Sequence, residues 1–112
     1  MSPLNISAKD AATGPVLEVT GNLDFEHATA LRQQIERLTL RRGQRLVLDL
    51  ASMEFCDSSG IAVLIAARRH AVAAGAELAL AAVPANTLRV LAIVGLDQVF
   101  TFHPDTATAT AV

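Results

Sequence analysis

The chain has 112 residues, with 9 Lys and Arg against 11 Asp and Glu and a formal net charge of -2 at pH 7, and this length corresponds to one compact domain. A hydrophobic content of 52% excludes a disordered chain, and one cysteine excludes an internal disulfide and a cysteine-cluster zinc site. The acidic balance and the aromatic content of 4% argue against a nucleic-acid partner, because such a surface carries a basic stripe or a stacking platform.

The first part of the chain predicts two strands and a helix. Residues 16–20 alternate in polarity as a half-buried strand does, and Gly21 ends the pattern, while a weaker strand is expected near residues 4–7. Apolar residues then recur at helical spacing over residues 28–38, which predicts an amphipathic helix. Asp24 is a candidate N-cap or first-turn acid for this helix.

The middle of the chain predicts a buried strand followed by an alanine-rich helix. Residues 46–50 are almost continuously apolar, which is typical of a strand covered on both faces. Residues 61–74 predict a helix that Gly75 ends as a C′ residue. The larger apolar residues of this helix are Ile61, Leu64, Ile65 and Val72.

The last part continues the alternation. It predicts a strand at 78–83, a helix at 84–94 with Leu88, Leu91 and Val94 on one side, and a short strand at 99–102. We expect a core over residues 4–103 and a frayed tail at 104–112. The order predicts one α/β domain over residues 1–112, with a mixed sheet of four to five strands and about three to four helices.

The sharpest local feature is the sequence Asp57-Ser58-Ser59-Gly60, which lies between the predicted buried strand and the helix that follows it. Functional residues of α/β sheets often lie at this edge, and the free N–H groups of a first helical turn favour an anion there. Two interpretations are open: Ser58 or Ser59 is simply an N-cap, or a hydroxyl here is phosphorylated.

Three segments carry a resemblance to STAS domain proteins of the anti-sigma-factor-antagonist family, and the resemblance extends over about residues 17–102. Gly21-Asn22-Leu23-Asp24 resembles the family's Gly-x-Leu-Asp turn, and residues 46–56 resemble its central strand. Asp57-Ser58-Ser59-Gly60-Ile61 resembles its phosphorylation motif. The resemblance implies that Ser58 is the phosphoacceptor, that Asp57 positions the hydroxyl, and that Ser59 and Gly60 start the helix.

The resemblance also implies a function without catalysis. The unphosphorylated chain would bind an anti-sigma factor with serine kinase activity and release a sigma factor. Phosphorylation would weaken that complex, and a PP2C-type phosphatase would reset it, so ATP and metals belong to the partners and no cofactor is expected here. A second STAS role, as an accessory subunit of a transport complex or a larger signalling assembly, remains open.

The other chemistry-bearing residues predict no catalytic or metal site. The three histidines have no metal-ligand spacing, and no base stands near Cys56, which we expect to be a half-buried structural thiol. Phe25 is either an interface anchor or a core residue. We expect the partner surface to consist of Asp24, Phe25, Asp57, Ser58, Ser59, Gly60 and Ile61. The first residues lack a signal-peptide pattern, and no stretch is apolar enough to span a membrane, so we expect a cytoplasmic protein.

Overall fold

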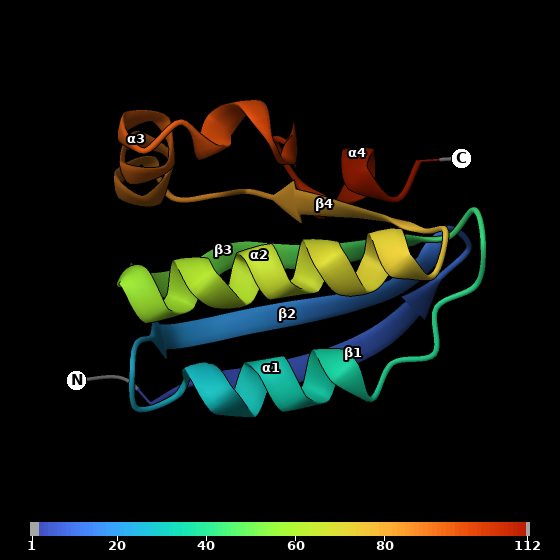
Figure 1. The fold of residues 1–112 in the computed structure, drawn as a ribbon, viewed down its shortest axis with the longest axis horizontal. Coiled ribbons are helices and arrows are strands. Elements are labelled where there is room, and N and C mark those ends of the chain that lie inside the picture. Colours follow the sequence, from blue (N-terminus) through green and yellow to red (C-terminus); the bar gives the residue numbers. More distant parts are fainter. Residues whose placement is uncertain (1–2, 112) are drawn as a thin grey trace.

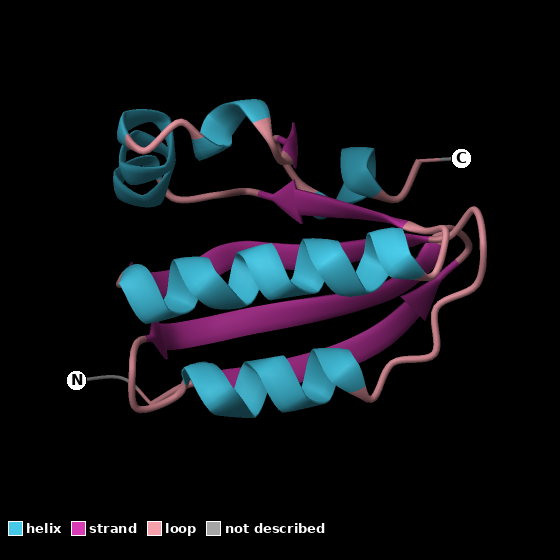
Figure 2. Ribbon diagram, viewed as in Figure 1, coloured by secondary structure: helices cyan, strands magenta, loops and turns pink. Residues whose placement is uncertain are grey.

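A mixed sheet of five strands in the order β1-β2-β3-β4-β5 organises the chain in a computed structural model that describes residues 3–111. Figures 1 and 2 show helices α1 and α2 side by side across the sheet. The elements are β1 (Asn5–Ala11), β2 (Gly14–Leu23), α1 (Ala28–Glu36), β3 (Arg45–Cys56), α2 (Ser58–Ala73), β4 (Glu77–Ala81), α3 (Ala85–Ile93), the 3-10 helix η1 (Leu96–Gln98), β5 (Thr101–His103) and α4 (Thr106–Ala109).

The strand directions bring the functional loops to one edge. β1 pairs antiparallel with β2, whereas the pairs β2–β3, β3–β4 and β4–β5 are parallel. The carboxyl ends of four strands therefore face the same way, and the loops that follow β2 and β3 lie at that edge (Figure 1). The predicted α/β class, the mixed sheet and the number of helices are confirmed.

The main core lies between the sheet and the two helices α1 and α2. Successive strand residues point to opposite faces, so Leu46, Leu48 and Leu50 face the helices, whereas Val47 faces the other side. Leu64 of α2 packs into the same helix-covered core and is fully buried. The central strand thus has apolar cover on both faces, as its sequence predicts.

The tail differs from the expectation that residues 104–112 fray. Residues 106–109 form α4, and Ala109 is fully buried in a small cluster on the other face of the sheet, with Val47 among its neighbours. Arg45 Nη1 donates a hydrogen bond of 2.8 Å to the Ala109 carbonyl oxygen, and Asp105 caps the helix. The polarity pattern of a tail of Thr and Ala does not predict a helix, but its small side chains allow this close packing. Val112, like Met1 and Ser2 of the predicted domain, lies outside the described residues.

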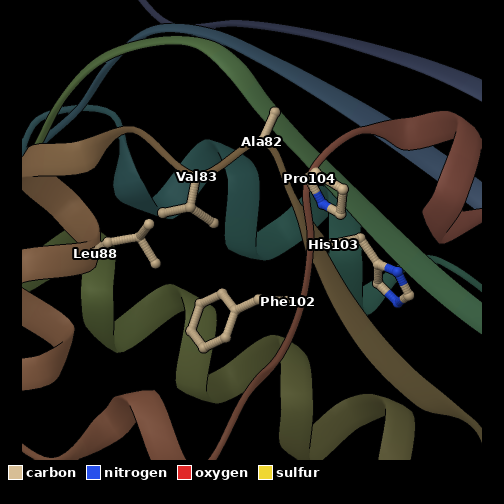
Figure 3. Close-up of a pocket in the computed structure, with 6 residues that line it drawn as sticks. All are labelled: Ala82, Val83, Leu88, Phe102, His103 and Pro104. Atoms are coloured by element: carbon tan, nitrogen blue, oxygen red, sulfur yellow. The ribbon is translucent and has the colours of Figure 1, made fainter.

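Helix α3 packs less closely than its sequence predicts. Leu91 is buried as expected, but Leu88 is 39% exposed and Val94 is 57% exposed. Figure 1 shows the reason: α3 lies beyond the end of β4 and not across the sheet. A hollow of about 330 Å³ separates α3 from β5 (Figure 3), where Val83, Leu88 and Phe102 surround a common space and the His103 ring lies on the other side of the β5 backbone.

Candidate functional site

Asp57 forms the start of α2. Its backbone is extended (φ -98°, ψ -170°), and its Oδ1 accepts hydrogen bonds from the backbone N–H groups of Ser59 at 2.9 Å and Gly60 at 3.1 Å. The interpretation that Ser58 or Ser59 is the N-cap is therefore wrong, because the carboxylate between strand and helix takes that role. Neither serine hydroxyl is needed to begin the helix.

The second oxygen of Asp57 links two loops. Its Oδ2 accepts a hydrogen bond of 3.1 Å from the backbone N–H of Phe25, which lies in the loop after β2. The backbone N–H of Asp57 donates to the Leu23 carbonyl oxygen at 3.3 Å. The loops that contain Asp24 and Ser58 thus meet at one edge, as the strand order predicts, and one carboxylate holds them together.

Gly60 allows α2 to approach β2 closely. A Cβ at this position would lie 2.5 Å from the Leu23 carbonyl oxygen and 2.7 Å from Cys56 Sγ. These distances are too short for any side chain, so backbone contact between helix and strand requires glycine here. The glycine of the motif therefore fixes where the preceding serines stand relative to the sheet edge.

Asp24 holds its own loop instead of capping α1, whose N-cap is His27. Its Oδ1 accepts a hydrogen bond from the His27 backbone N–H at 3.1 Å and lies 2.8 Å from His27 Nδ1. Desolvation raises the pKa of the Asp24 carboxyl, but these hydrogen bonds and the His27 charge outweigh it, and the pKa lies below its ordinary value. The carboxylate is thereby kept ionised at the edge that Ser58 shares.

Ser58 is exposed and lies in the wall of a groove. The groove holds about 470 Å³, and one side is the start of α2 while the other is α3 and η1. The first-turn residue Ile61 lies on the α2 side, and the lining contains no basic side chain. The complete lining is Cys56, Asp57, Ser58, Ile61, Val90, Val94 and Leu96.

A second, smaller hollow of about 220 Å³ lies on the α1 side of the same loop. Phe25 and Ser59 line it together with Arg32. The Phe25 side chain is 83% exposed, so the alternative that it is a core residue is wrong. The seven predicted partner-surface residues therefore lie on two loops and one helical turn at a common edge, where Gly60 itself is buried.

The α3 side of the groove was not predicted from the sequence. Val90, Val94 and Leu96 line it, and of these only Val94 was named, as a residue on one side of the predicted helix. A signal was present, since the helix over 84–94 contains more large apolar residues than a single buried face can hold. An excess of large apolar residues in one helix therefore indicates that part of its apolar surface is exposed.

Cys56 is half-buried beside the motif. Burial raises the pKa of its thiol to about 11, and the negative charge of Asp57 adds to the effect. The thiol is protonated at neutral pH and is a poor nucleophile, which agrees with the expected structural role. Within residues 3–111, His, Cys, Asp and Glu form no cluster suited to a metal ion, and no helix combines the length and apolarity needed to cross a bilayer.

Comparison with known proteins identifies the family. Residues 6–102 match the family model described as "Mlab, STAS domain". A STAS-domain containing protein of Pseudomonas aeruginosa is 31% identical over 97 residues, which cover 85% of this chain and 95% of the relative.

Two solved structures show the same fold. An anti-sigma factor antagonist from Mycobacterium paratuberculosis is 27% identical, with a TM-score of 0.83 over 96% of this chain and 91% of that chain. A sulfate transporter family protein from Wolinella succinogenes shares the fold at 16% identity, with a TM-score of 0.73 over 85% of this chain and 80% of that chain. With the family model covering most of its length, the chain belongs to the STAS domain family.

Proposed function

We propose that this chain is a cytoplasmic anti-sigma factor antagonist controlled by phosphorylation of Ser58. In its unphosphorylated form it binds an anti-sigma factor that is also a serine kinase, and a sigma factor is released. The kinase transfers a phosphoryl group from ATP to the Ser58 hydroxyl, and the complex dissociates. A PP2C-type phosphatase removes the phosphate by hydrolysis, so this chain is a substrate of both enzymes and catalyses neither step.

One observation carries the proposal: Ser58 is the first residue of α2, is exposed, and does not cap the helix. Asp57 already accepts the N–H groups of Ser59 and Gly60, so modifying Ser58 removes no hydrogen bond that starts α2. The likeness to the antagonist from Mycobacterium paratuberculosis, at 27% identity over nearly the whole chain, supports the same role.

The charges around Ser58 explain how a phosphate would act. It adds about -1.5 to -2 charges to a chain of net charge -2. The nearest N–H donors of the first turn are taken by Asp57, and the adjoining groove has no basic side chain. The helix N-terminus tolerates the phosphate, but nothing in the groove pairs with it. The added charge therefore acts on the bound partner, and the fold of this chain stays as it is.

The site is tested by incubating the chain with its cognate kinase-type anti-sigma factor and ATP, followed by mass spectrometry of the peptides. We expect one phosphate, on Ser58, in the wild-type chain and in the matched control Ser59→Ala, and none in Ser58→Ala. Phosphate on another residue, or an unchanged mass of the wild-type chain, contradicts the proposed site.

The switch is tested by measuring affinity for the same anti-sigma factor. Ser58→Ala should bind whether or not ATP is present, whereas phosphorylation of the wild-type chain should weaken binding about 100-fold, which corresponds to about 3 kcal/mol. Ser58→Asp should fall between them, because a carboxylate carries less charge than a phosphate dianion. Equal affinity of all three forms would rule out an electrostatic switch.

A second candidate function is an accessory subunit of a transport complex. The observation that favours it is the fold shared with a sulfate transporter family protein. Stable co-purification with an ABC-type ATPase, together with no affinity for a kinase-type anti-sigma factor, would select this function over the first.

A further inference from the structure

We propose that a cluster of arginines toward the end of the molecule far from Ser58 is a docking surface for the phosphate groups of an anionic phospholipid membrane. The inference goes beyond the proposed function, because it concerns another part of the chain and a different kind of partner. We call this cluster the arginine surface. It consists of Arg37, Arg41, Arg42, Arg68 and Arg69.

The arginine surface is visible in the charge pattern of the sequence. Residues 37–48 and 58–76 contain six of the nine Lys and Arg residues and no Asp or Glu. The net charge of -2 conceals this pattern, because acidic residues gather elsewhere. Asp24, Glu26 and Asp57 lie at the edge that holds Ser58. The two ends of the chain therefore carry opposite charge, and the basic end attracts anions.

Contacts between distant segments bring the arginines together. His70 Nε2 of α2 donates a hydrogen bond of 2.9 Å to the Leu38 carbonyl oxygen, in the loop after α1. Further along this loop, the Gly43 backbone N–H donates to the Gly75 carbonyl oxygen at 2.9 Å. Figure 1 shows this loop beside the last turn of α2. Because α2 has 16 residues, about 24 Å separate its two ends, and Ser58 lies at the other one.

The five guanidinium groups are available to an anion. All five residues are exposed, and within residues 3–111 none of them forms an ion pair with a carboxylate. The loop that carries Arg41 and Arg42 is ordered by its own contacts: the Arg41 backbone N–H donates to Gln44 Oε1 at 2.8 Å, and the stem of Arg42 packs against Gly75. An anion can therefore bind here without first breaking an internal ion pair.

The chemistry of these side chains favours phosphate. The planar guanidinium group donates two parallel hydrogen bonds to the oxygens of one phosphate group, and all five cations of the arginine surface are Arg. Cations near an anionic membrane each add to the affinity without a fixed spacing between them. A membrane therefore suits five arginines that are spread over a loop and two helices.

The surroundings of the arginine surface argue against the other large anions. A stable protein interface needs aromatic or large apolar anchors, but this surface contains no Phe, and its exposed large apolar neighbour is Val72 alone. Nucleic-acid readers insert a helix or a strand pair into a groove, whereas α1 and α2 lie side by side across the sheet (Figure 2). A lipid surface requires neither feature.

Docking through the arginine surface leaves the phosphorylation motif accessible. The start of α2 lies at the far end of the helix from the loop that carries Arg41 and Arg42 (Figure 1). A chain held at a membrane by this loop would present Ser58 on the side away from the lipid. Membrane binding and partner binding would then use separate surfaces.

The test is co-sedimentation with vesicles. The purified chain should bind vesicles of an equal mixture of phosphatidylcholine and phosphatidylglycerol, and should not bind vesicles of phosphatidylcholine alone. Arg41→Gln combined with Arg42→Gln should weaken this binding about 30-fold. Arg68→Gln combined with Arg69→Gln should weaken it to the same extent.

The matched control is Arg89→Gln. Arg89 is also exposed and, within the described part of the chain, also lacks a carboxylate partner, but it lies on α3. Its substitution should change vesicle binding by no more than about twofold. Raising the salt concentration from about 0.01 M to about 0.15 M shortens the Debye length from about 30 Å to about 8 Å, and should weaken binding of the wild-type chain more than that of either double variant.

Three results would overturn the inference: equal binding to both kinds of vesicle, binding to neither, or folded double variants that bind as tightly as Arg89→Gln. The two double variants alter separate segments, so one of them still decides if the other does not fold. Tighter binding to duplex DNA at equal phosphate concentration would make nucleic acid the occupant and also overturn it. No measurement here uses the kinase, so a failure leaves the proposed function of Ser58 untouched.

Discussion

The two helices that flank the groove differ in what holds them. The start of α2 is fixed by backbone contacts: Asp57 accepts three N–H groups, and Gly60 lets the helix touch β2. Helix α3 has no side-chain cap at its first residue, and only Thr87 and Leu91 are buried. The rigid side presents Ser58 in one position, while the loosely packed side exposes apolar surface that the fold does not need. The position of the proposed phosphoacceptor and the exposed apolar surface thus have different structural origins.

The largest expected effect tests whether α2 and α3 really differ in packing. Leu64→Ala in α2 removes a fully buried side chain, and Leu88→Ala in α3 removes one that is 39% exposed. We expect Leu64→Ala to lower the free energy of unfolding by about 2–5 kcal/mol and Leu88→Ala by no more than about 1 kcal/mol. Urea unfolding followed by far-UV circular dichroism measures both. Equal losses would mean that α3 belongs to the cooperative core.

The second largest expected change in the free energy of unfolding tests the close approach of α2 to β2. Gly60→Ala would place a methyl group against Leu23 and Cys56, and overpacking of this kind costs about 1–3 kcal/mol of unfolding free energy. The neighbouring Ser59→Ala is the control and should stay within about 0.5 kcal/mol of the wild type. A fully stable Gly60→Ala chain would show that the helix can move away from the strand without loss.

A smaller effect separates the two roles of Asp57. Asp57→Ala loses the cap and the link to Phe25, and should lower the free energy of unfolding by about 1 kcal/mol. Asp57→Asn keeps one acceptor oxygen for the first turn, so it should cost clearly less, although its amide group cannot accept the Phe25 N–H. Thermal unfolding of both variants measures the difference. If both are equally destabilised, the link to Phe25 matters more than the cap.

The smallest effect concerns the pKa of Asp24. Because this pKa is lowered from 3.8 in the folded chain, ionised Asp24 contributes stability above pH 3.8, and that contribution is lost as the pH falls through the folded-state pKa. His27→Ala removes one hydrogen-bond partner and should raise the pKa toward 3.8, which reduces the pH dependence. Carboxyl-carbon NMR titration measures the shift. An unchanged pKa would show that the His27 backbone N–H alone sets it.

The polarity pattern of the sequence predicted a helix or strand correctly where the apolar residues of the pattern are also the buried ones. The apolar residues of the run 46–50 are buried on both faces of the sheet, and this run predicted the strand. The strand continues to Cys56, which polarity alone did not show. The pairing of β3 with β4 ends at Asp49, so the second half of β3 pairs only with β2. That pairing with β2 contains register shifts. The alternation is broken there, and Phe55 is exposed.

The parts of the site that escaped prediction depend on distances between segments far apart in the chain. The motif located Ser58, but nothing local shows that Asp57 reaches the Phe25 N–H, 32 residues earlier. Likewise, the helix over 84–94 was expected from its spacing, whereas its position beyond the end of β4 depends on how short that strand is. The buried contact of Ala109 with a distant strand has the same cause.

The hydrogen bond between the Phe25 backbone N–H and the Asp57 carboxylate makes the Phe25 amide an NMR probe of the site. An amide proton that binds a carboxylate is sensitive to the charge and position of that group, and this carboxylate belongs to the residue directly before Ser58. In a ¹H–¹⁵N correlation spectrum, the Phe25 resonance should therefore move with the phosphorylation state of Ser58. One backbone signal from another loop would then follow kinase and phosphatase turnover in real time, without a label on the partner proteins.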